Sequence, residues 1–259
     1  MDTDTILTGD CFDVMSTLPA GCADLGFIDQ PFNRGLPYIG YKDRLPEEVY
    51  LARMDRLLSE MRRILAPTGS LFVQINDEWA GDVKVRLDAM FSRQNWRNTI
   101  IWAYRFGQHQ KRKFGRDHQQ ILYYVADPKH FTFNADDVRI RSERQRLGDK
   151  RANPDGRVPG DVWLIRRLPG NDKRRRGHPC QTPPEVAERI IRAASNPGDV
   201  VLDLMCGTGS VLAVAKRLSR RWLGIEVSPA TAEQARRHVA NETVDLFARL
   251  PSNNGLSRK

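Results

Sequence analysis

The sequence contains few cysteines and no long apolar run. Its four cysteines show no Cys-x-x-Cys spacing and no flanking histidine pairs, so we expect neither a metal site nor a disulfide framework. No apolar stretch reaches about 18 residues and no charged-then-apolar leader occurs, so we expect neither a membrane span nor secretion. These absences predict a protein of a reducing compartment, and the cytoplasm is the expected location.

Acidic residues are scarce in one region of the chain. Between residues 103 and 177 the sequence carries 19 Lys and Arg against 9 Asp and Glu, whereas the remainder carries 22 against 23. A nearly neutral scaffold with one strongly basic region indicates a polyanionic partner that binds there. The length of 259 residues and the hydrophobic content of 40% are ordinary for a globular protein with a full core.

The stretch Val200–Ser210 has the pattern of a strand, a glycine turn and the start of a helix. Its apolar strand ends at Asp203, and the next apolar strand ends at Glu226, where a carboxylate can accept hydrogen bonds from a ribose diol. A dinucleotide-binding fingerprint needs a third glycine, but Leu212 stands in its place. The turn therefore favours an adenosine with a charged group other than phosphate, such as S-adenosylmethionine, over a nicotinamide dinucleotide. An ordinary turn without a ligand is the alternative.

A second candidate site follows an apolar strand expected at residues 23–28. The residues that come next are Asp29, Gln30, Pro31 and Phe32, and open α/β sheets bind ligands outside the carboxyl ends of their strands. This segment resembles the Asp-Pro-Pro-Tyr/Phe catalytic motif of the DNA methyltransferases that methylate adenine N6 or cytosine N4. The resemblance implies that Asp29 and the carbonyl of residue 30 accept hydrogen bonds from the exocyclic amine. It also implies that Phe32 stacks on a base flipped out of the duplex.

Further segments resemble the same family in the same order along the chain. They are Met61–Val73, Asp161–Trp163, His178–Pro184 and Asn196–Asp203. The order of catalytic motif, recognition region and cofactor strand is similar to that of the β group of amino-methyltransferases. The resemblance implies a Rossmann-like α/β fold with permuted motif order and a seven-stranded, mostly parallel sheet that contains one antiparallel strand.

Four regions follow from this order. We expect the catalytic half at residues 1–104, a basic target-recognition insertion with some core strand at 105–177, the cofactor-binding half at 178–250 and a disordered tail at 251–259. Apolar periodicity predicts helices at about 46–65 and 185–194 and strands at 70–75, 98–102 and 118–125. Residues 33–42 are rich in Gly, Pro and Tyr and predict a mobile loop over the site.

The resemblance also assigns residues to ligands. The residues expected at the cofactor are Asp10, Cys11, Asp29, His178, Thr182, Asp203, Cys206, Gly207, Thr208, Gly209 and Glu226. The N-terminus of the helix after Thr182 would hold the methionine carboxylate. The densest basic clusters would contact DNA phosphates, through Lys111, Arg112, Lys113, Arg174, Arg175 and Arg176.

Two departures from the family pattern leave alternatives open. Gln30 stands where the family has proline, so the loop loses the ring that fixes φ, and Thr182 replaces a lysine. The leading expectation is an adenine-N6 DNA methyltransferase of the restriction-modification type, located at the nucleoid and able to form a homodimer. Cytosine-N4 methylation at the same site and a DNA-binding protein with weakened catalysis are the alternatives. Cys180 follows a proline, as in cytosine-C5 enzymes, but a helix-cap neighbour is the favoured interpretation.

Overall fold

The structure is a computed structural model that describes residues 1–104, 110–172, 174–176 and 180–245. Its main sheet has the strand order β1-β10-β9-β2-β5-β7-β6-β8 in these residues. The strands of this sheet are β1 (Thr5–Thr8), β2 (Ala23–Ile28), β5 (Leu65–Ile75), β6 (Trp96–Ala103), β7 (His118–Val125), β8 (Val162–Leu164), β9 (Val200–Asp203) and β10 (Arg221–Glu226). The helices are α1 (Cys11–Thr17), α2 (Glu47–Ile64), α3 (Ala80–Phe91), α4 (Glu143–Arg146), α5 (Pro184–Ala194), α6 (Ser210–Arg217) and α7 (Pro229–Ala240), with short 3-10 turns at Arg93–Asn95 and Asp136–Val138.

Strand direction decides where a site can form. Strands β1, β10, β9, β2 and β5 are parallel neighbours, whereas β7 is antiparallel to both β5 and β6. The carboxyl ends of the parallel strands therefore meet at one edge of the sheet, where open α/β sheets bind ligands. The expected mostly parallel sheet with one antiparallel strand is confirmed. The expected number of seven strands is wrong for the described residues, because the three-residue strand β8 pairs with β6 at the sheet edge.

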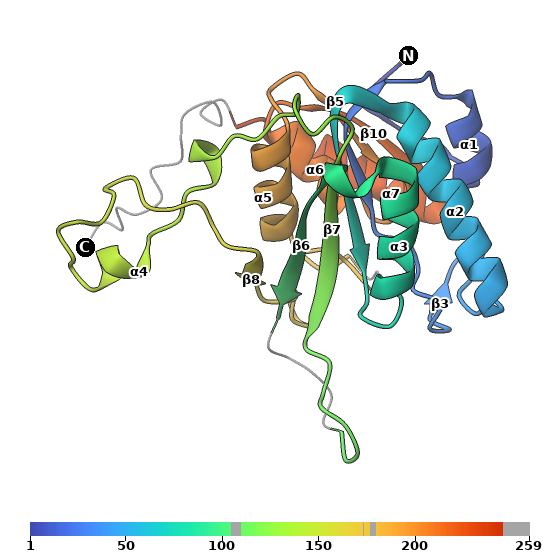
Figure 1. The fold of residues 1–259 in the computed structure, drawn as a ribbon. Coiled ribbons are helices and arrows are strands. Elements are labelled where there is room, and N and C mark those ends of the chain that lie inside the picture. The colour runs from blue at the N-terminus through green and yellow to red at the C-terminus, as the bar shows by residue number, and fades with distance from the viewer. Residues whose placement is uncertain (105–109, 173, 177–179, 246–259) are drawn as a thin grey trace.

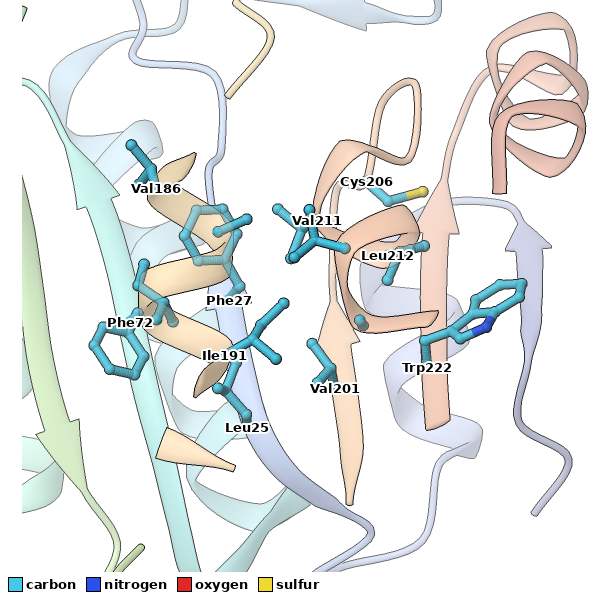
Figure 2. Close-up of a cluster of buried hydrophobic side chains, with 14 of the residues drawn as sticks. Leu25, Phe27, Phe72, Val186, Ile191, Val201, Cys206, Val211, Leu212 and Trp222 are labelled. Carbon is cyan, nitrogen blue, oxygen red and sulfur yellow. The ribbon is translucent and has the colours of Figure 1, made fainter. Parts of the chain in front are cut away.

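Helices cover both faces of the sheet and give three layers (Figure 1). Helices α5, α6 and α7 pack on one face, and α1, α2 and α3 pack on the other. Figure 2 shows the first of these cores, in which Phe27 and Val201 of the sheet lie beside Ile191 of α5 and Val211 of α6. Strands that are buried on both faces need continuous apolar sequence, which is what residues 25–28 and 200–202 have.

Most expected elements agree with the structure to within a few residues. The helices predicted at 46–65 and 185–194 correspond to α2 and α5, and the strands predicted at 98–102 and 118–125 correspond to β6 and β7. The strand predicted at 70–75 begins five residues earlier, at Leu65, because Leu65 pairs with Ala23 before the register shifts. The tail expected at 251–259 lies outside the described residues.

Residues 33–42 contain more structure than the expected loop. They include a small antiparallel hairpin formed by β3 (Pro37–Tyr38) and β4 (Tyr41–Lys42). The ends of the segment are joined because the side-chain amide of Asn33 both donates to the Leu45 carbonyl, at 2.9 Å, and accepts from the Leu45 N–H, at 2.6 Å. A turn rich in Gly and Pro therefore folds back on itself here, and its mobility stays a prediction.

Candidate functional site

A cavity opens at the carboxyl ends of β1, β2, β9 and β10. It brings together residues that are up to about 200 positions apart in the sequence, since these strands end at one edge of the sheet. The residues of the two expected sites that line it are Asp10, Cys11, Asp29, Gln30, Pro31, Phe32, Thr182, Asp203, Cys206, Gly207, Thr208 and Glu226. The expected catalytic motif and the expected cofactor strand thus face one common space.

Of the described residues expected at the cofactor, Gly209 is the one that does not line the cavity. His178 lies outside the described residues. Gly209 caps the N-terminus of α6 with φ of 76°, and a Cβ there would meet Ala235 and Val239 of α7 at 3.2 and 3.1 Å. Gly209 is therefore required by the left-handed turn and by the close approach of two helices, whereas Gly207 lies at the cavity.

Glu226 ends β10 and is oriented by backbone donors. Its Oε2 accepts a hydrogen bond from Gly207 N at 3.1 Å, and its Oε1 accepts one from Ser228 N at 2.9 Å. Burial raises the pKa of Glu226, and these backbone hydrogen bonds partly oppose the rise. The carboxylate is thereby fixed between the glycine turn and the start of α7, and its remaining lone pairs can accept hydrogen bonds from hydroxyl groups.

Two more carboxyl groups lie deep in the cavity. Burial raises the pKa of Asp203, at the end of β9, to about 8, although Met205 N donates to its Oδ1 at 3.3 Å. Burial also raises the pKa of Asp29, which follows β2, to about 7. Carboxyl groups withdrawn from water favour a bound cationic ligand, because its charge stabilises their ionised forms.

Asp29 accepts a hydrogen bond from a residue that is distant in the sequence. The Thr182 hydroxyl, in the segment before α5, donates to Asp29 Oδ2 at 3.0 Å and opposes the effect of burial on the pKa of Asp29. Thr182 is itself buried, with 6% of its surface exposed. Thr182, which we expect at the cofactor, thus contacts Asp29, which we expect at the substrate amine.

Aromatic residues from α2 and from the N-cap of α3 support the segment after Asp29. Gln30 is buried, and its Nε2 donates to the Tyr50 hydroxyl at 3.4 Å. The indole Nε1 of Trp79 donates to the Phe32 carbonyl at 3.0 Å, and the ring centroids of Tyr50 and Trp79 lie 4.8 Å apart. The sequence gives no signal for a role of Tyr50 or Trp79 at the site, because neither belongs to a recognisable motif.

Cys180 lines the cavity but is not an activated thiol. Burial raises its pKa, and its thiol is hydrogen-bonded to the side chain of Tyr38 in the β3–β4 hairpin. A cysteine nucleophile needs the thiolate form, which burial disfavours. These observations favour a structural role for Cys180, in which it joins the hairpin to the segment before α5.

The two basic clusters have different surroundings. Lys111, Arg112 and Lys113 are exposed, in a segment that extends beyond the sheet edge before β7 (Figure 1). Arg174, in contrast, is ion-paired with Asp172 at 2.9 Å and with Glu185 at 2.7 Å. Arg175 lines a small pocket beside Trp102, and Arg176 lines the main cavity. The second cluster therefore lies at the rim of the site, with Arg174 and Arg176 exposed and Arg175 half-buried.

Metal-binding clusters and membrane spans are both absent from the described part of the chain. There, no group of three or more His, Cys, Asp or Glu side chains is arranged to hold a metal ion. No helix within those same residues is both long and apolar enough to cross a membrane.

Comparison with known proteins shows what the chain is similar to. The sequence model of a DNA methylase family, N6_N4_Mtase, matches residues 23–237. The DNA adenine methyltransferase YhdJ of Escherichia coli (strain K12) is 31% identical over 233 residues, which cover 86% of this chain and 78% of that protein. The type II methyltransferase M.BglII of Bacillus subtilis is 30% identical over 253 residues, which cover 92% and 69% of the two chains.

Two solved structures share the fold. The PvuII DNA methyltransferase (cytosine-N4-specific) superposes with a TM-score of 0.71 at 16% identity, over 92% of this chain and 86% of that one. TTHA0409 of Thermus thermophilus, complexed with S-adenosyl-L-methionine, superposes with a TM-score of 0.63 at 24% identity, over 92% and 93% of the two chains. At these identities the likeness concerns the fold.

Proposed function

The chain belongs to the N6_N4_Mtase family of DNA methylases, and on that premise we propose that it methylates the exocyclic N6 of a flipped adenine in DNA with S-adenosylmethionine as methyl donor. The observation that carries the proposal is the shared cavity: Asp29 and Phe32 of the expected catalytic motif face the same space as Asp203 and Glu226. A methyl transfer needs the donor and the acceptor in one enclosed site. The name of the relative YhdJ, a DNA adenine methyltransferase, supports adenine as the base.

The chemistry of the cavity fits this donor. When bound, S-adenosylmethionine supplies a methyl group on a positively charged sulfur. Glu226 is oriented to accept hydrogen bonds from the ribose hydroxyls, and Asp10 and Cys11 line the cavity beyond it. Asp203 and Asp29 are the buried carboxyl groups that a sulfonium or an ammonium group would keep ionised.

Asp29 is the residue that would activate the amine. An exocyclic amine is a poor nucleophile because its lone pair is delocalised into the base. The lone pairs of Asp29 that Thr182 does not use, together with the Gln30 carbonyl, accept hydrogen bonds from the two N–H groups and favour a pyramidal nitrogen. Once methylated, the nitrogen would carry a surplus proton, and the Asp29 carboxylate is placed to accept it.

Phe32 would hold the base during this step. It lines the cavity and its carbonyl is anchored by Trp79, so its ring is presented from a supported segment. A flipped base needs a flat apolar partner in place of its lost stacking neighbours. The bond between Gln30 and Tyr50 supports the same segment without the proline ring that the family motif has. This arrangement favours an active enzyme over a binding protein that has lost catalysis.

Double-stranded DNA would contact the exposed basic segment. Lys111, Arg112 and Lys113 project from the carboxyl end of β6, which lies at the same sheet edge as the cavity, and the neighbouring Phe114 is 98% exposed. Adjacent exposed cations of this kind neutralise backbone phosphates without reading the base sequence.

The identity of the methylated nucleoside tests the proposal. Purified protein is incubated with unmethylated genomic DNA and S-adenosylmethionine with a labelled methyl group, and the DNA is digested to nucleosides for mass spectrometry. The expected product is N6-methyladenine. N4-methylcytosine would keep the site and its mechanism but assign the other base. Absence of both products, with the cofactor bound in calorimetry, would contradict an enzymatic role.

A further inference from the structure

Arg176 lies at the rim of the cavity and is held there by its backbone. Its N–H donates to Gln181 Oε1 at 2.9 Å, and its carbonyl accepts from Gln234 Nε2 of α7 at 2.7 Å. Arg176 is exposed and lines the cavity together with Gly207 and Thr208. Because the backbone carries these contacts, the position of the segment does not depend on the guanidinium group.

The charges around the cavity are unbalanced. Four acidic residues line it: Asp10, Asp29, Asp203 and Glu226. Among the described residues, two cations line it as well, Arg53 and Arg176. These two arginines attract the negative group of a ligand that otherwise carries positive groups.

Arg53 occupies the Cys11 end of the cavity. Its guanidinium lies 4.8 Å from the centroid of the Phe12 ring and 5.7 Å from the centroid of the Tyr41 ring. The guanidinium thus has two aromatic neighbours. Cation–π contacts of this kind hold an arginine against a wall of the site. Arg53 is therefore placed to pack beside a ring system rather than beside a carboxylate.

Arg176 lies at the other end, near the glycine turn. Burial lowers the pKa of His238, and the charge of Arg176 lowers it further. The ring Nδ1 of His238 is 2.7 Å from the Thr208 carbonyl, so the charge of Arg176 acts on a side chain that contacts the glycine turn. Within the described residues Arg176 forms no ion pair, whereas its neighbour Arg174 is paired with both Asp172 and Glu185.

We propose that Arg176 binds the carboxylate of the methionine part of S-adenosylmethionine, an inference that rests on the proposed function. The cofactor carries a sulfonium and an ammonium group, which suit the four acidic residues, and one carboxylate, which suits a guanidinium. A guanidinium can donate two parallel hydrogen bonds to a carboxylate. Thr182 is uncharged and already donates to Asp29, so it offers no positive charge at this end. Arg176 is thereby a cofactor-binding residue and not a contact to DNA.

A pair of ligands tests this assignment. Calorimetry measures the binding of S-adenosylmethionine and of its decarboxylated form, which lacks only the carboxylate, to the wild-type protein and to Arg176→Gln. We expect the substitution to weaken binding of S-adenosylmethionine about 10- to 100-fold, which is the range for a charge-assisted hydrogen bond. Binding of the decarboxylated form should change less than about twofold, because that ligand has no group for Arg176 to hold.

Arg174→Gln is the matched control, since Arg174 belongs to the same segment but is ion-paired outside the cavity. It should leave the binding of both ligands unchanged. Equal losses for both ligands in Arg176→Gln, or no loss for either, would overturn the assignment while the wild-type protein still binds the cofactor. If the wild-type protein binds neither ligand, the proposed function itself fails, and the assignment fails with it.

Discussion

The Thr182 hydroxyl donates a hydrogen bond of 3.0 Å to Asp29 Oδ2, across 153 positions of sequence. Thr182 precedes α5, and Asp29 follows β2, so this contact joins the two halves of the chain at the carboxylate that would receive the substrate amine. Burial raises the pKa of Asp29 to about 7, and the hydrogen bond limits that rise. The contact therefore controls how much of Asp29 is ionised near neutral pH.

Removal of this hydroxyl should shift the pH dependence of the reaction. In Thr182→Val the pKa of Asp29 rises further, so less carboxylate is present at pH 7 and the rate there falls several-fold. The rate should recover as the pH increases, because the higher pKa only moves the ionisation of Asp29 to a higher pH. The measurement is the single-turnover rate against pH. Thr182→Ser keeps a hydroxyl and should retain the wild-type profile, and an unshifted profile in the valine variant would contradict the role of the bond.

The Gln30–Tyr50 hydrogen bond should support the rate more than the stability. Gln30→Met and Tyr50→Phe each remove the bond, and each should lower the single-turnover rate up to about 10-fold. The double variant should be no slower than the slower single variant, because both changes remove one interaction. Gln30→Met also removes a buried Oε1 that has no hydrogen-bond partner among the described residues, so its melting temperature should not fall. Additive losses of rate would show that the two side chains act separately.

Cofactor binding should release protons from the cavity. Asp29 and Asp203, with pKa values of about 7 and 8, bind a cation best when ionised. Affinity for S-adenosylmethionine should therefore rise about 10-fold between pH 6 and pH 8, the change expected when one such group must lose its proton. S-adenosylhomocysteine has no sulfonium charge and should show a weaker dependence. Calorimetry over this range makes the comparison, and identical profiles for the two ligands would contradict it.

The exposed basic segment should contribute to DNA affinity through charge. Replacing Lys111, Arg112 and Lys113 together with Gln should weaken binding and reduce the slope of log K against log salt by about 1 for each phosphate that the segment no longer neutralises. Fluorescence anisotropy with a labelled duplex at several salt concentrations measures the slope. Arg237→Gln, in an exposed residue of α7 that is paired with Glu233, is the control and should leave the slope unchanged. An unchanged slope in the triple variant would exclude this segment from the interface.

Much of the site could be predicted because its parts are local in sequence. An apolar strand ends at or just before each of Asp29, Asp203 and Glu226. Parallel neighbouring strands have their carboxyl ends at the same edge of a sheet, so these residues meet at one cavity. The family resemblance is confirmed by the match over residues 23–237. Strand β8 was missed as part of the sheet because three residues carry too little periodicity to indicate a strand.

The rest depends on contacts between distant segments. Arg174, Arg175 and Arg176 form one basic run in the sequence, but three different environments separate them in the fold. A run of basic residues in the sequence does not indicate which side chain forms an ion pair and which lines a cavity. Tyr50 of α2 and Trp79, the N-cap of α3, likewise support the segment after Asp29, although no motif marks either residue.

The most direct test of the account is the single-turnover rate of methyl transfer by the wild-type protein and by Asp29→Ala, each saturated with S-adenosylmethionine and DNA. Asp29 is the acceptor that activates the amine, so its loss should slow transfer at least about 100-fold. The cofactor should still bind, because Glu226 and the glycine turn are unchanged. A rate in Asp29→Ala equal to that of the wild-type protein, with the cofactor bound in both, would show that the amine is activated elsewhere and would contradict the account.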